Sequence, residues 1–213
     1  MDLDQLPDHI VYSKNVIEFV TVAAETCLFL EHSTDFSKTD FIRKSVKLLP
    51  LLYLKTSLVD SPEPVFDDAP ETFVTEEDYL FVKEQLEQIM GADDSYLEVF
   101  HPDMAISDTP IAAFVSENLA DIYQELKDFA ANYQLADMDI MNDALVACLR
   151  TFAEHWGQKL LNALRALHAI RFTDGFDDQE REDESEVKSK IDRNSFLNFL
   201  HDDNDDDLGN LLI

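Results

Sequence analysis

Glycine is scarce in this chain, and this scarcity limits the available folds more than any other feature of the sequence. The 213 residues include only 4 glycines and 7 prolines. Sandwiches, barrels and nucleotide-binding folds with glycine-rich loops need many residues that tolerate a positive φ. The composition is 46% hydrophobic and 10% aromatic, which is enough to fill the core of one domain. We therefore expect an all-α protein.

Apolar residues recur with a helical period along five stretches of the chain. The second stretch contains Pro50, where we expect a kink because proline removes a backbone donor. Unequal lengths and the absence of a recurring pattern argue against a helical-repeat protein and favour an irregular antiparallel bundle of about five helices. The predicted helices cover residues 14–32, 41–58, 76–90, about 110–133 and 138–172.

Two helix starts carry local signals. Thr75 precedes three acidic residues and is predicted to cap the third helix, which Gly91 ends. Asp108 or Thr109 is predicted to cap the fourth helix, with Pro110 in its first turn. Before the third helix, residues 60–74 hold three prolines among acids and are predicted to form a loop.

The charge balance restricts the kinds of partner. There are 45 acidic and 16 basic residues, a net charge of -29. Such a chain repels nucleic acids and anionic lipids at long range and favours basic protein partners.

No stretch approaches the ~18 apolar residues of a membrane span. The two cysteines, Cys27 and Cys148, lie within apolar helical patterns. We expect a cytoplasmic protein without a bound cofactor or metal; the sequence indicates no oligomeric state.

The C-terminal part of the chain differs from the rest in composition. We expect a helical bundle domain over residues 1–172 and an acidic tail over 173–213, where 14 acids face four bases. Within the tail a short apolar helical turn is flanked by acids, and further leucines follow. A solvated linker would not retain such residues, so we expect them to bind the body or another protein, with a disordered solubility tail as the alternative. The predicted partner-binding residues are Phe196, Leu197, Phe199, Leu200, Leu211 and Leu212.

Basic residues gather on two of the predicted helices despite the acidic average. They could bind a phosphate-bearing ligand, or they could pair with the acidic loop or tail of the same chain. No aromatic residues alternate with them as in many nucleic-acid interfaces. The predicted basic face consists of Arg43, Lys44, Lys47, Arg150 and Arg165.

A metal-dependent enzyme is the main catalytic alternative. Helix carboxylates hold Mg²⁺ in all-helical nucleotide hydrolases, and Glu76, Glu77, Glu125 and Asp128 are the candidate ligands here. The third glutamate of that pattern is missing, and helix capping explains the first pair without a metal. We therefore predict no catalytic residue.

Parts of the chain are similar to a known family. The stretches VIEFVTVAAETCLFLE and FIRKSVKLLPLLYLK, together with the long final helix, resemble an uncharacterised family of bacterial all-helical proteins classed as a domain of unknown function. The resemblance covers roughly residues 1–172. It implies a cytosolic helical fold and assigns no role to any residue.

The working hypothesis is a non-catalytic cytosolic interaction or regulatory protein. Its acidic tail would dock on its own body or on a basic partner. Two alternatives stay open: the Mg²⁺-dependent nucleotide hydrolase, and a nucleic-acid mimic whose acidic surface would occupy the groove of a DNA-binding protein.

Overall fold

All five predicted helical stretches form helices. The computed structural model describes residues 9–98 and 111–176. Its chain divides into two units, Met1–Asp174 and Gly175–Ile213, and the helices belong to the first. The fifth stretch is divided into α5 and α6, so the α-helices are α1 (Lys14–Glu31), α2 (Lys38–Ser57), α3 (Glu76–Met90), α4 (Val115–Gln134), α5 (Met138–Thr151) and α6 (Gly157–Arg171).

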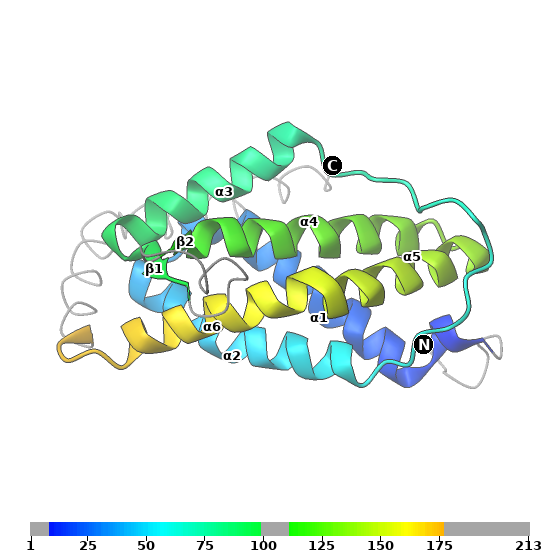
Figure 1. The fold of residues 1–213 in the computed structure, drawn as a ribbon, viewed down its shortest axis with the longest axis horizontal. Coiled ribbons are helices and arrows are strands. Elements are labelled where there is room, and N and C mark those ends of the chain that lie inside the picture. The colour runs from blue at the N-terminus through cyan, green and yellow to red at the C-terminus, as the bar shows by residue number, and fades with distance from the viewer. Residues whose placement is uncertain (1–8, 99–110, 177–213) are drawn as a thin grey trace, which may run out of the picture. The chain divides into compact units, whose positions relative to one another are not determined.

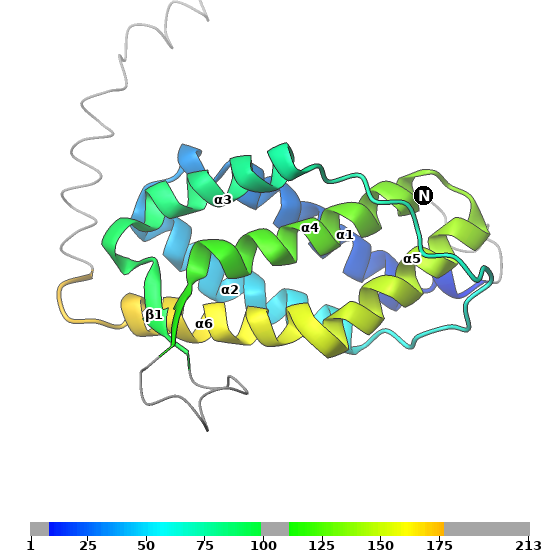
Figure 2. The same cartoon turned by 45° about the horizontal axis from the view of Figure 1, so that its top comes forward.

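Helices α1 to α5 run in alternating directions along the chain, and α6 continues in the direction of α5 (Figure 1). Helix α4 lies at the centre of the bundle, where it packs against α1, α3, α5 and α6, while α2 packs against α1 and α6 (Figure 2). Leu119, Ile122 and Leu126 of α4 are fully buried. One side of every other helix therefore faces α4 or a neighbour of α4.

Short-range capping explains where several helices begin. The Ser13 side chain accepts a hydrogen bond from the Val16 amide at the start of α1. Thr75 and Asp78 form a reciprocal capping box at the start of α3, so the predicted start of this helix is confirmed. Gly91 ends α3 with a φ of 56°, a conformation that glycine adopts without strain.

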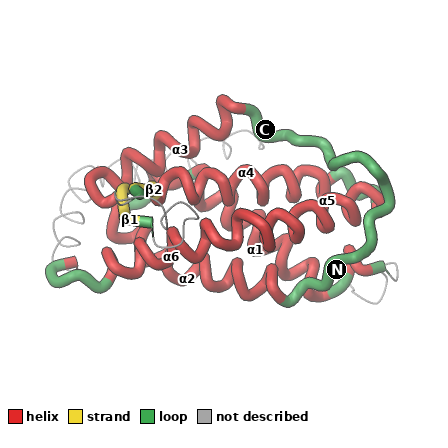
Figure 3. Tube along the Cα trace, in the orientation of Figure 1, coloured by secondary structure: helices red, strands yellow, loops and turns green. Residues whose placement is uncertain are grey.

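The fourth helix begins later than predicted, at Val115. Residues 112–114 form the strand β2 (Ala112–Phe114), which pairs antiparallel with β1 (Ser95–Leu97) in a small hairpin (Figure 3). The cap comes from Asp94, whose carboxylate accepts hydrogen bonds from the Ser116 amide and hydroxyl at 2.8 and 2.7 Å. The predicted caps Asp108 and Thr109 lie outside the described residues. The start of α4 is therefore determined by strand pairing and by a cap from a residue distant in sequence.

The last helix is not continuous as predicted. A π-helical turn, η6 (Phe152–Trp156), separates α5 from α6. At Gly157 a side chain would place its Cβ 2.5 Å from the Phe152 carbonyl oxygen, so the wide turn requires glycine there. The Trp156 indole is buried and donates to the Cys148 carbonyl at 3.1 Å. Packing of the aromatic residues thus sets the break.

The buried face of α1 contains Phe19 and Ala23, which are fully buried, whereas Leu28 is exposed. The Phe19 ring stacks on the Phe129 ring of α4, with centroids 5.1 Å apart. In α2 the helix continues through Pro50, which lies on the exposed side.

Candidate functional site

Helix α2 carries a row of exposed leucines next to exposed lysines. Leu51, Leu54 and Leu58 are 41%, 52% and 48% exposed, and their spacing places them on one side of the helix. Lys44 and Lys47 are exposed on the same side, one and two turns earlier. We call these five residues the basic-apolar face.

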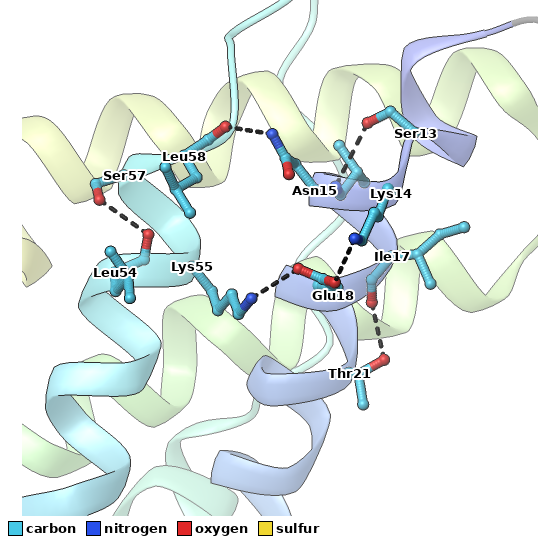
Figure 4. Close-up of polar contacts among 11 residues, drawn as sticks. Ser13, Lys14, Asn15, Ile17, Glu18, Thr21, Leu54, Lys55, Ser57 and Leu58 are labelled. Carbon is cyan, nitrogen blue, oxygen red and sulfur yellow. Dashed lines mark hydrogen bonds and ion pairs between the residues drawn. The ribbon is translucent and has the colours of Figure 1, made fainter.

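The other two lysines of α2 hold it to neighbouring elements. Lys38 donates to the Met90 carbonyl at the end of α3, at 2.8 Å. Lys55 forms a 2.6 Å ion pair with Glu18 of α1, drawn in Figure 4, and this partner lowers the pKa of the glutamate. These two lysines therefore fix the position of α2, whereas Lys44 and Lys47 face solvent.

The residues of the predicted basic face are spread over three helices. Lys44 lies over the Phe36 ring, 3.8 Å from its centroid, and Arg43 beside it is half-buried. Arg165 is exposed on α6, which packs against α2. Arg150 lies at the end of α5, where it lines a hollow together with acidic residues of the 59–75 segment. The structure thus places Arg150 apart from the α2 lysines, in acidic surroundings.

Helix α3 has an exposed face of the opposite charge. Leu80 and Phe81 are 41% and 58% exposed. They line a surface hollow of about 670 Å³ together with Glu76, Glu77 and Glu84. We call these five residues the acidic-apolar face.

A long strap without helix or strand, residues 59–75, connects α2 to α3 along the outside of the bundle (Figures 1 and 2). The Asp143 carboxylate of α5 accepts hydrogen bonds from the Val65 and Phe66 amides, both at 2.7 Å. Burial raises the pKa of Asp143, but these amides and the Asn142 side chain outweigh that effect and lower it below its usual value. The loop that the prolines predict is therefore an anchored strap.

Two of the four carboxylates of the hydrolase alternative, Glu125 and Asp128, have structural partners. Asp128 accepts hydrogen bonds from the Phe73 and Val74 amides at 2.6 and 2.8 Å and so anchors the second half of the strap. Glu125 accepts one from the Thr151 hydroxyl at 2.6 Å. Within residues 9–98 and 111–176, no three histidine, cysteine or acidic side chains are grouped to hold a metal ion. The geometry of this part of the chain gives the hydrolase alternative no support.

Both cysteines are buried in the core. Burial raises the pKa of the Cys27 thiol to about 12 and that of Cys148 well above its usual value. A thiol that stays protonated at neutral pH is a poor nucleophile. These residues therefore serve as packing groups, as their apolar neighbours in the sequence predict.

Sequence reasoning missed the apolar half of both faces. The signal was present in the sequence: Leu51, Leu54 and Leu58 repeat with a helical period, and Leu80 and Phe81 are adjacent apolar residues that follow the acids at the start of the third helix. The partner-binding residues predicted in the tail, Phe196 to Leu200 with Leu211 and Leu212, lie outside the described residues.

No helix within residues 9–98 and 111–176 has both the length and the apolar character needed to cross a membrane.

Comparisons with known proteins identify the family but no activity. No curated protein matches the chain. A crystal structure of a Bacteroides fragilis protein, solved in a structural genomics programme, is 44% identical, with a TM-score of 0.70. The match covers 78% of this chain and 97% of that one. The family model described as domain of unknown function (DUF5063) matches residues 10–173. The chain therefore belongs to the DUF5063 family.

Proposed function

We propose that this chain is a non-catalytic interaction protein of the cytoplasm with a regulatory role. The apolar turn of its acidic tail, Phe196 to Leu200, together with Leu211 and Leu212, docks either on the basic-apolar face of α2 or on a basic partner. The two sites compete for the tail, so a partner that captures the tail uncovers the α2 face.

The observation that carries the proposal is the composition of the α2 face. In a chain of net charge -29, two exposed lysines border three exposed leucines on one side of a helix. The tail has the complementary composition, with the apolar residues Phe196, Leu197, Phe199 and Leu200 followed by Asp202 and Asp203. Opposite charges steer the two segments together, and apolar contact holds them.

Energy and reach are compatible with docking in the same molecule. Burying one leucine or phenylalanine side chain contributes ~1.5 to 3 kcal/mol, so four of them can offset the cost of ordering one turn. Phe196 lies 25 residues beyond the end of α6 at Arg171, and α6 packs against α2. Twenty-five residues reach at most about 80 to 90 Å when fully extended, which exceeds the ~30 Å length of α2.

The test replaces Phe196, Leu197, Phe199 and Leu200 with alanine in the full chain. Far-UV circular dichroism is expected to keep the helical signal of the body, while amide hydrogen exchange in the tail becomes faster or a co-purified basic partner is lost. The control replaces Asn194 and Asn198, polar residues of the same segment, with alanine and is expected to change neither measurement. Unchanged tail exchange and unchanged co-purification in the fourfold variant would contradict the proposal.

A further inference from the structure

The outer side of α3 has no packing role within the described bundle. Helix α3 packs against α4 through its opposite side, where Val82, Leu86 and Met90 are buried. Its Tyr79 hydroxyl donates to Asp121 of α4 at 2.9 Å. Leu80 and Phe81 project from the other side and remain more than two-fifths exposed. These two adjacent side chains offer an apolar contact surface to a partner.

The charges around this apolar pair are all of one sign. Glu76, Glu77 and Glu84 line the hollow beside Leu80 and Phe81, and no basic residue lines it. The nearest lysine in sequence, Lys83, is paired with Glu117 of α4 at 2.9 Å, on the inner side of the helix. A partner must therefore bring the cations itself.

We propose that the acidic-apolar face of α3 binds a basic amphipathic helix of another protein. Its apolar side chains cover Leu80 and Phe81, and its lysine or arginine side chains pair with Glu76, Glu77 and Glu84. Such recognition lays the apolar side of a helix on an apolar surface, and the acids that flank Leu80 and Phe81 favour basic residues along the edges of that helix. The carboxylates repel nucleic acids and anionic membranes, so a protein segment is the partner that fits.

This inference rests on the proposed interaction role and not on tail docking, because the tail is acidic and the α3 face repels it. The two can therefore fail separately. A second copy of the chain is disfavoured as the occupant because each copy carries a net charge of -29.

The test uses the full-length chain and a synthetic 15-residue peptide in which leucines repeat at helical spacing on one side and lysines fill the other. Binding is measured by fluorescence anisotropy at 0.15 M salt, and hydrogen exchange maps the site. The double variants Leu80→Ser with Phe81→Ser, and Glu77→Lys with Glu84→Lys, are expected to raise Kd roughly tenfold or more. Protection from exchange is expected over residues 76–84.

Control variants on α1 distinguish specific binding at the α3 face from non-specific attraction of a basic peptide to an acidic chain. Leu28 and Glu25 are exposed on α1, so Leu28→Ser and Glu25→Lys make the same chemical changes elsewhere. Both are expected to leave Kd within about twofold. Equal effects of the α1 and α3 variants, or protection on another helix, would overturn the inference. Loss of affinity for the α3 variants alone supports it, even when the tail variants behave like the unmodified chain.

Discussion

The α2 and α3 faces are built alike and charged oppositely. Each is the outer side of a helix whose inner side lies in the core, and each presents large apolar side chains to solvent. On α2 the apolar row follows Lys44 and Lys47, whereas on α3 the apolar pair lies among three glutamates. Under the two proposals, the exposed apolar residues supply the affinity of each face, and the charge decides which partner that face accepts.

The composition of the α2 face differs more from the average of the chain than that of the α3 face. Acidic residues outnumber basic ones 45 to 16, so an acidic border around any exposed apolar group is the common case. A pair of exposed lysines beside three exposed leucines departs from this background. We therefore propose an acidic segment as the occupant of α2 and a basic one as the occupant of α3; the 59–75 strap connects these two helices.

The largest effect should come from damage to the framework that holds both faces. Replacing Gly157 with valine forces a Cβ to within 2.5 Å of the Phe152 carbonyl, a backbone atom that cannot move aside. The variant is expected to lose about 3 kcal/mol of unfolding free energy in urea. The control introduces valine at the neighbouring, exposed position. Gln158→Val should change the unfolding free energy by less than about 0.5 kcal/mol. Equal stabilities would contradict the role of the π-helical turn.

Loss of the cap of α4 should cause the second-largest loss of unfolding free energy. Asp94→Ala leaves the buried Ser116 amide and hydroxyl without their acceptor, at a cost of about 2 kcal/mol. Its neighbour Asp93 pairs with Lys38 near the surface, so Asp93→Ala should cost less than about 1 kcal/mol. Urea denaturation of the two variants compares a buried cap with an exposed ion pair. A larger loss in Asp93→Ala would show that Asp94 is not the main anchor of α4.

The anchor of the strap should depend on pH. The pKa of Asp143 is lower in the folded protein than in the unfolded chain, so its stabilising effect is present above the unfolded pKa of about 3.9 and is lost as pH falls through the folded value. Asp143→Asn is expected to cost about 1 kcal/mol at pH 7 and to speed proteolytic cleavage within residues 59–75. Below about pH 4 the difference between the two proteins should shrink. A difference that does not vary with pH would argue against a charged acceptor.

The smallest effect on stability should come from the faces themselves. Lys44→Glu combined with Lys47→Glu changes only exposed side chains and should alter the unfolding free energy by less than about 1 kcal/mol, with some loss of the Lys44–Phe36 contact. The reversed charges should nevertheless abolish tail docking, visible as faster amide exchange in the tail. Unchanged exchange in the folded variant would remove α2 as the docking surface.

The sequence predicted most where the decisive contacts are local. The start of α3 depends on Thr75 and Asp78, three residues apart, and its end depends on Gly91, so both boundaries were correct. The start of α4 depends on Asp94, which lies 21 residues before Val115, and on strand pairing with residues 95–97. No local pattern contains such contacts, so the predicted start was wrong.

Tertiary packing explains the other differences. The π-helical turn results from the packing of Phe152 and Trp156 and from the space left by Gly157, which helical periodicity does not reveal. For the candidate site, the sequence indicated Lys44 and Lys47 of α2 and the acids at the start of α3. It did not indicate the exposed apolar residues beside them on either helix. A helical period identifies apolar rows, and the neighbouring helices decide which row is buried.

The most direct test of the account measures where the tail lies in the full-length chain. A nitroxide spin label at His201→Cys can be attached selectively because Cys27 and Cys148 are buried with raised pKa values. Paramagnetic broadening is then read on the leucine methyl resonances. The account predicts strong broadening at Leu51, Leu54 and Leu58, its loss when residues 196–200 carry the fourfold alanine change, and little at Leu80. Equal broadening on both faces, or none on α2 in the absence of a partner, would contradict it.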